Sequence, residues 1–313
     1  MNEQSIVVVG RHWRERHNEM AFVIRSIAGE ASRWAQVSVL VPGNEGRGPD
    51  GAFDIETIGE HAHYAWPDHL SPDCVVVVDD LSPEIADLLA KVGPRAVFYL
   101  AAHKGGHDPL WRALPLTADP TSSRPFVKIY IPVNPLAELH RHNGFGFTGY
   151  QLVLSGRTGV RRDPPPAVAW LTAAFHNSDV IVVENAVASA WRGRALRGTV
   201  SVDTRMDLWR LIAHANVCID LAPGPYVARE CVEALRFGTP IMVPVHSGAA
   251  VAHAAASQGA TFAEPEELLD AAASLRIDAT RSATSRSGRQ YADANYGAPA
   301  EFMTSLRAAL SPE

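Results

Sequence analysis

The chain has 313 residues, of which 47% are hydrophobic and 20% are charged, with a formal net charge of −6. This length suits two domains of ordinary size, and the composition excludes a disordered chain. The acidic balance argues against a nucleic-acid partner. No apolar run is close to the length of about 18 residues that a helix needs to span a bilayer. The first apolar run begins within a few residues of Met1, which we interpret as leaving no room for a signal peptide. We therefore expect a cytoplasmic protein with no transmembrane segment.

Continuous apolar runs alternate with helical patterns in the first half of the chain. Such runs are typical of strands in a parallel sheet that is covered on both faces. They lie at 5–10, 36–42, 74–80, 96–102 and 126–133. Between the third and fourth runs, Ser82 is placed as a helix N-cap, Pro83 fits the first helical position and Gly93 ends the pattern. This order predicts a βαβ unit.

A glycine-rich segment follows the first series of strands. Gly144, Gly146 and Gly149 form a G-x-G-x-x-G pattern, but a dinucleotide-binding fingerprint must follow a strand and open a helix. Here the pattern follows a helical segment and leads into a strand. The segment 134–149 therefore favours a hinge between two sheets, which would leave a cleft between them.

The second half of the chain repeats the alternation. Its apolar runs lie at 150–156, 179–185, 198–202, 217–222 and 240–245. In the helical pattern that precedes the fourth run, Thr204 is placed to cap the helix with Asp207. Its inward face consists of Leu208, Leu211, Ile212 and Ala215. The chain is therefore predicted to be an α/β protein with two parallel sheets of similar size.

Three other features lack the context that their chemistry needs. The run that ends in Asp79 and Asp80 resembles a Walker B strand, but the sequence contains no Walker A loop. The histidine pairs occur in no known zinc-binding pattern. The three cysteines, Cys74, Cys218 and Cys231, lie in apolar patterns without a C-x-x-C pair. We expect reduced, buried thiols, no metal and no cofactor.

The segment 207–244 carries the strongest functional signal. A buried strand runs into a Pro/Gly turn and then into a helix that is expected to begin at Pro225 and to end at Gly238. The free amides near Tyr226 and Val227 would point outward at the carboxyl edge of the sheet, where anions bind. Glu233 lies two turns down this helix.

The sequence EALRFGTPI in this segment resembles the donor-nucleotide half of GT-B glycosyltransferases, specifically glycosyltransferase family 4. That family has an E-x7-E pattern followed by A-x-x-x-G-x-P, and its second Glu matches Glu233. The resemblance covers residues 150–297, including SGRT after the first strand and the closing GRQYADANYG. In the first half of the chain, the resemblance is limited to the order of the strands.

The resemblance implies two Rossmann-like domains that face each other across a cleft. Residues 1–145 would form the acceptor-side domain and residues 146–298 the nucleotide-sugar domain. The amphipathic helix in 299–313 would pack back on the first domain.

The resemblance also implies a metal-independent, retaining transfer of sugar from a nucleoside diphosphate sugar to an unidentified small-molecule or glycan acceptor. Arg157 would hold the donor diphosphate, and Glu233 would accept hydrogen bonds from the ribose. His103 would lie on the acceptor side, and backbone groups around Val200–Val202 would face the base. Fixed cations and helix-start amides stabilise a leaving diphosphate without a metal.

The sequence departs from the family pattern at several positions. The first Glu of the pair is replaced by Pro225, and a Lys after the G-R turn is missing, so that Arg161 or Arg162 must substitute. An N-terminal Gly-Gly loop is absent after Gly10. These departures favour one alternative, a non-catalytic nucleotide-sugar-binding or scaffold protein. A sugar-nucleotide epimerase is a second alternative, although its Ser-Gly-Gly turn is replaced by APGP at 222–225.

Each proposed residue also has a purely structural interpretation. Glu233 could form surface ion pairs with Arg229 and Arg236, which lie four residues before it and three after it. His103 could be an ordinary histidine at a strand end. The arginines at 157, 161 and 162 could be a solvated basic loop.

Overall fold

The computed structural model of the chain divides into two compact units. One consists of Met1–Leu116, Arg124–Tyr130 and Pro299–Glu313, and the other of Thr117–Ser123 and Ile131–Ala298. We call them unit 1 and unit 2. The structure describes residues 4–10, 19–41, 48–50, 53–57, 65–78, 83–92, 96–100, 111–114, 127–139, 151–155, 179–183, 199–200, 204–220, 229–245 and 249–310.

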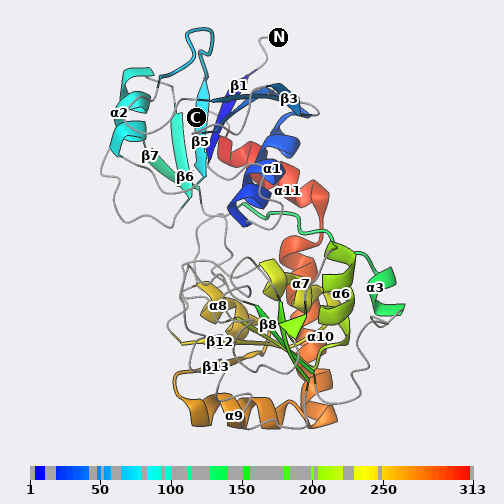
Figure 1. The fold of residues 1–313 in the computed structure, drawn as a ribbon. Coiled ribbons are helices and arrows are strands. Elements are labelled where there is room, and N and C mark those ends of the chain that lie inside the picture. Colours follow the sequence, from blue (N-terminus) through cyan, green and yellow to red (C-terminus); the bar gives the residue numbers. More distant parts are fainter. Residues whose placement is uncertain are drawn as a thin grey trace. The chain divides into compact units, whose positions relative to one another are not determined.

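Unit 1 is built on a seven-stranded sheet in the order β3-β4-β2-β1-β5-β6-β7 (Figure 1). Its strands are β1 (Ser5–Gly10), β2 (Gln36–Val41), β3 (Gly48–Asp50), β4 (Phe53–Thr57), β5 (Cys74–Val78), β6 (Ala96–Leu100) and β7 (Trp111–Leu114). All pairs are parallel except β3 with β4. Without β3, the chain order across the sheet is 3-2-1-4-5-6, which is that of a doubly wound nucleotide-binding fold.

The helices of unit 1 are α1 (Glu19–Ala31), α2 (Pro83–Val92) and α11 (Pro299–Leu310). The last of these comes from the far end of the chain and packs against α1 (Figure 1). Its buried residues are Phe302, Leu306 and Leu310, spaced one turn apart. The side chain of Gln4 donates a hydrogen bond to the Leu310 carbonyl at 3.0 Å, which ties the end of α11 to the entry of β1.

We expected residues 126–133 to form a strand, and this prediction is wrong. Residues 127–133 form no helix or strand and belong to neither sheet. The amide of Lys128 donates to the Ser305 hydroxyl at 3.0 Å, and the amide of Ile131 donates to the Tyr296 carbonyl at 3.0 Å. The alternating apolar side chains are buried as a strand pattern requires, but the backbone is bonded to helical residues. The chain passes from unit 1 to unit 2 within this segment, between Tyr130 and Ile131.

Unit 2 is built on a six-stranded parallel sheet in the order β10-β9-β8-β11-β12-β13. Its strands are β8 (Gln151–Ser155), β9 (Asp179–Val183), β10 (Thr199–Val200), β11 (Val217–Asp220), β12 (Ile241–Pro244) and β13 (Ala260–Phe262). The chain order across this sheet is again 3-2-1-4-5-6. The prediction of an α/β chain with two parallel-sheet domains is therefore confirmed.

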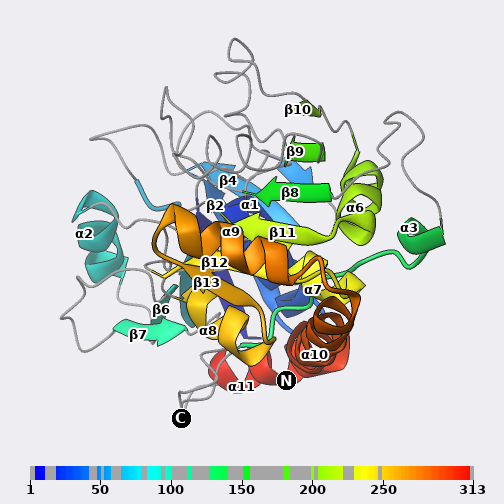
Figure 2. The same cartoon turned by 90° about the horizontal axis from the view of Figure 1, so that it is seen from below.

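The helices of unit 2 are α3 (Leu136–Leu139), α6 (Arg205–His214), α7 (Arg229–Phe237), α8 (Ala249–Ala256), α9 (Pro265–Ser274) and α10 (Asp278–Tyr296). Helix α7 packs against both α6 and α10 (Figure 2). The expected cap of α6 is confirmed, since the Thr204 hydroxyl accepts from the Asp207 amide at 3.1 Å. Ala215, which we expected on the inward helix face, is instead the half-buried C-cap. Gly238 ends α7 with a φ of +76°.

The domain bounds expected from the sequence, 1–145, 146–298 and 299–313, stay predictions; by its contacts the chain divides between Tyr130 and Ile131, and Pro299–Glu313 belongs to unit 1. The glycine pattern at 144–149 lies outside the described residues. Among the helices that the structure describes, none combines the length and apolar character of a membrane span.

Candidate functional site

The site is best located from the topology of unit 2. In doubly wound sheets, ligands bind beyond the carboxyl ends of the strands, at the point where the strand order reverses. In unit 2 this point lies between β8 and β11, whose last residues, Ser155 and Asp220, are paired. Helix α7 follows β11 along the chain, and Arg157 is the second residue after β8. The sequence motifs of the donor half therefore flank this reversal point.

Helix α7 presents two carboxylates near its start. Glu233 is 0% exposed and Glu230 is 8% exposed, which is unusual because ionised groups are buried only when they are paired. Other buried residues of the helix pack it onto the unit, namely Cys231, Val232, Ala234, Leu235 and Phe237. The helix therefore requires cations beside its two acids.

The first of these cations is Arg205, the first residue of α6. Its Nε donates to Glu233 Oε1 at 3.1 Å, and its Nη2 donates to Glu233 Oε2. Its Nη1 donates to Glu230 Oε1 at 3.0 Å. One guanidinium thus holds both oxygens of one carboxylate and one oxygen of another, and it joins α6 to α7.

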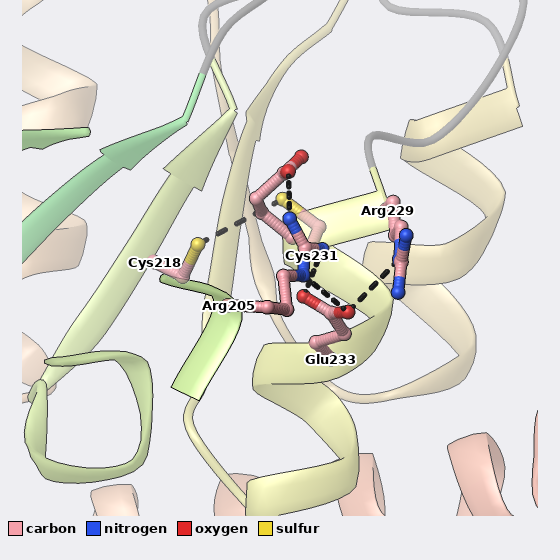
Figure 3. A network of polar contacts seen from close by, with 6 residues as sticks. Arg205, Cys218, Arg229, Cys231 and Glu233 are labelled. Carbon is pink, nitrogen blue, oxygen red and sulfur yellow. Dashed lines mark hydrogen bonds and ion pairs between the residues drawn. The ribbon is translucent and has the colours of Figure 1, made fainter. Parts of the chain in front are cut away.

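The second cation is Arg229, which lies one turn before Glu233 on α7. Its Nε donates to Glu233 Oε1 at 2.9 Å. The two arginines reach the Glu233 carboxylate from different sides (Figure 3). We call Arg205, Arg229, Glu230 and Glu233 the Arg–Glu cluster. Its formal charges cancel, and its arginine side chains are 26% and 15% exposed.

The two carboxyl groups of the Arg–Glu cluster differ in their electrostatics. Burial raises the pKa of Glu233 above its usual range, despite the opposing attraction of Arg205 and Arg229. Burial also acts on Glu230, but there the attraction of Arg205 and Arg229 and the hydrogen bonds to the carboxylate together outweigh it and lower the pKa. Burial alone would lower the pKa of Arg205, but the two carboxylates raise it.

The structure answers the question of surface ion pairs at Glu233. The pair with Arg229 exists, but Glu233 is buried and the pair is part of a larger cluster. Arg236 does not pair with Glu233. Instead it donates to Asp293 at 3.2 Å and to the Ile131 carbonyl at 2.7 Å. The surface interpretation of Glu233 is therefore wrong.

Two buried thiols lie beside the cluster. The Sγ atoms of Cys218 on β11 and Cys231 on α7 are 4.0 Å apart (Figure 3). All three cysteines are free and buried, as the sequence predicted. The contact between Cys218 and Cys231 is part of the packing of α7 on β11.

Of the predicted site residues, Glu233 is the one that the structure describes. Arg157, Arg161, Arg162, His103, Tyr226, Val227 and Val202 lie outside the described residues, as does Pro225. Their assignments stay predictions. Sequence reasoning missed Arg205 and Glu230. The signal for Glu230 was its place one turn before Glu233, but Arg205 lies 28 residues from Glu233 and has no local signal.

No protein-family model and no curated protein sequence matches the chain. Among solved structures, the glycosyltransferase WaaG, involved in lipopolysaccharide biosynthesis, is 17% identical with a TM-score of 0.58, and 98% of each chain is covered. Anabaena Alr3699/HepE, solved in complex with UDP and glucose, is 15% identical with a TM-score of 0.64 over 98% of each chain. The chain has the GT-B fold.

The GT-B fold was the fold expected from the sequence, and that expectation is confirmed. Membership of family 4 stays a prediction, because likeness at these identities concerns the fold alone. The same fold also includes a Listeria monocytogenes protein described as a UDP-N-acetylglucosamine 2-epimerase, which is 10% identical with a TM-score of 0.54 over 99% of this chain and 95% of that chain. The fold is therefore compatible with more than one chemistry.

Proposed function

We propose that this protein is a metal-independent, retaining glycosyltransferase that uses a nucleoside diphosphate sugar as donor. The observation that carries the proposal is the Arg–Glu cluster on α7. It lies on the helix that follows β11, beside the strand-order reversal of unit 2, which is where nucleotides bind in such sheets. Its acid Glu233 occupies the position at which the family motif has its second Glu.

The proposed chemistry requires positive charge beside the departing diphosphate. Breaking the sugar–phosphate bond leaves negative charge on the nucleoside diphosphate while the sugar becomes oxocarbenium-like, and fixed donors that meet this charge lower the barrier. We assign this task to Arg157, to Arg161 or Arg162, and to the amides of Tyr226 and Val227. We assign the acceptor side to His103.

The donor's nucleoside would be recognised at Glu233 and near Val202. A carboxylate accepts hydrogen bonds at two oxygens, which suits the two neighbouring hydroxyls of a ribose. The acceptor belongs to the class of small molecules or glycans that offer a hydroxyl to the sugar.

Two other functions have specific support. The Listeria structure favours an epimerase, and Pro225 in place of the first motif Glu favours a protein that binds nucleotide sugars without turning them over. We place both behind glycosyl transfer because the chain has APGP where the epimerase turn has Ser-Gly-Gly, and because the rest of the donor motif is present.

One experiment separates the three functions. The purified protein is incubated with UDP-, GDP- and ADP-sugars, and the products are followed by chromatography and NMR. Slow release of free nucleotide, with the sugar anomer retained, supports glycosyl transfer. A new sugar isomer supports epimerisation, and binding with neither product supports the scaffold. We expect Arg157→Ala to lower kcat/KM by about 10²–10³, whereas Arg281→Ala, at a half-buried arginine of α10 that pairs with Asp278, serves as the matched control. Unchanged turnover in Arg157→Ala would overturn the assignment of that residue.

A further inference from the structure

The two arginines of the Arg–Glu cluster hold Glu233 in unequal ways. Arg205 comes from another helix and makes three hydrogen bonds to two carboxylates. Arg229 lies on the same helix as Glu233 and makes one hydrogen bond to it, through Nε. Both arginines share the oxygen Oε1. A ligand that approaches Glu233 must therefore compete with arginine N–H groups for this carboxylate.

We infer that Arg205 is a positioning residue that holds Glu233 for the donor ribose, and that the ribose hydroxyls take the place of Arg229 on Oε1. This inference rests on the proposed function. It assigns different roles to two residues of the same type on the same carboxylate. It also explains how a buried carboxylate becomes available to a ligand.

The energetics of the two contacts favour this division of roles. Arg229 makes a single hydrogen bond to Glu233 from the same helix, whereas Arg205 makes two to Glu233 and one to Glu230. When Arg229 leaves, Glu233 stays paired with Arg205, so no buried charge is left alone. Moving Arg205 instead would remove the guanidinium from both Glu230 and Glu233, and removing one partner of a buried pair changes an equilibrium by roughly a hundredfold or more. A ligand therefore displaces Arg229 more readily than Arg205.

The surroundings of Glu233 supply no described replacement for Arg205. On α7 the charged neighbours are Arg229 and Glu230, and on α6 the neighbour is Arg205. The described charged residues that α10 brings to α7 engage its other end, where Arg289 bonds the Phe237 carbonyl and Asp293 pairs with Arg236. Among the described residues, Arg205 is therefore the one cation from another element that holds this carboxylate.

The test measures how much the ribose hydroxyls contribute to binding. UDP, GDP and ADP and their 2′,3′-dideoxy counterparts are titrated calorimetrically into the wild-type protein and the variants Arg205→Met, Arg229→Met and Arg210→Met. For the nucleotide that binds, the wild type should prefer the ribose form by roughly tenfold or more, because hydrogen bonds to a charged group are lost in the dideoxy form. Arg210 pairs with Asp207 on α6, outside the Arg–Glu cluster, and is the matched control.

We expect Arg205→Met to abolish this preference, so that the ribose and dideoxy forms bind about equally, since the carboxylate loses its orientation. Arg229→Met should keep or increase it, because a competitor is removed, and Arg210→Met should match the wild type. Arg205→Lys keeps the charge but lacks the planar fork, so it should behave like Arg205→Met. Thermal unfolding of each variant checks that it is folded, and Arg229→Met tests the inference even if Arg205→Met does not fold.

The outcomes separate the inference from the proposed function. Loss of the ribose preference in Arg229→Met, or its retention in folded Arg205→Met or Arg205→Lys, would overturn the inference while leaving glycosyl transfer intact. Failure of every nucleotide to bind the wild type would overturn the proposed function, and the inference with it.

Discussion

The guanidinium of Arg205 meets the carboxylate of Glu233 side-on, with Nε donating to Oε1 at 3.1 Å and Nη2 donating to Oε2. The two residues are 28 positions apart in the sequence. Because Arg205 begins α6 and Glu233 lies within α7, this pair fixes the start of one helix against the other. Its geometry predicts an effect on stability.

We expect Arg205→Met to lower the free energy of unfolding by about 3 kcal/mol, because it leaves two buried carboxylates with a single arginine. Arg210→Met removes one partly exposed contact within the same helix and should cost about 0.5 kcal/mol. Urea denaturation followed by circular dichroism measures both. Equal losses in the two variants would contradict a special role for the Arg205 contact.

The opposite pKa directions of Glu230 and Glu233 predict opposite pH dependences. The pKa of Glu233 is raised in the folded state, so its contribution to stability is present below the unfolded value of about 4.3 and is lost as the pH rises through the folded pKa. The pKa of Glu230 is lowered, so its contribution is present above about 4.3 and is lost as the pH falls through the folded pKa.

Urea denaturation of the wild type, Glu233→Gln and Glu230→Gln at pH values between about 3 and 7 tests the two predicted pH dependences of stability. The stability advantage of the wild type over Glu233→Gln should shrink with rising pH, and its advantage over Glu230→Gln should shrink with falling pH. Parallel curves for the two variants would refute the assignment.

Two glycines should respond in opposite directions to the same substitution. Gly238 has a φ of +76°, and an added Cβ would lie 3.4 Å from its nearest neighbours, an ordinary contact. Gly238→Ala should therefore cost about 1–2 kcal/mol, for backbone reasons alone. Gly29 lies inside α1 with no atom within 4 Å of an added Cβ, so Gly29→Ala should stabilise by about 0.5–1 kcal/mol. Urea denaturation would disprove this prediction if both changes had the same sign.

The cysteines should be unreactive in the native protein. Burial, with a contribution from Asp73, raises the pKa of the Cys74 thiol to about 12. The contact with the Cys218 thiol, together with burial, raises the pKa of Cys231. Because the thiolate is the reactive form, a maleimide reagent at neutral pH should label Cys74, Cys218 and Cys231 only after urea is added. Ser274→Cys, at an exposed helix position, should react at once and serves as the control. Rapid labelling of a native cysteine would contradict the prediction.

The strands that were predicted from sequence are those with long apolar runs. A long apolar run identifies a strand that is covered on both faces and distinguishes it from the turns on either side, as in β1, β5 and β11. The strands β7 and β13 are short and mixed in composition, so they carry no comparable pattern. The segment 126–133 shows the opposite failure. Its apolar residues Val127, Ile129 and Ile131 are buried, but an apolar run cannot tell a sheet partner from a helix.

The candidate site was predictable only where its contacts are local. The contact between Arg229 and Glu233 follows from their spacing of four on a helix. The contact of Arg205 with the same carboxylate depends on how α6 packs against α7, and neither helix encodes this packing by itself. The burial of Glu233 has the same origin, which is why sequence reasoning placed its ion pairs at the surface.

The position of α11 affects how the protein is made. This helix covers α1 in unit 1, yet it is encoded after all of unit 2. Domains usually fold in the order in which they leave the ribosome, but here unit 1 cannot complete its core until α11, which follows unit 2 along the chain, has been made. Until then the apolar surface that meets Phe302 and Leu306 lies open to water and to chaperones.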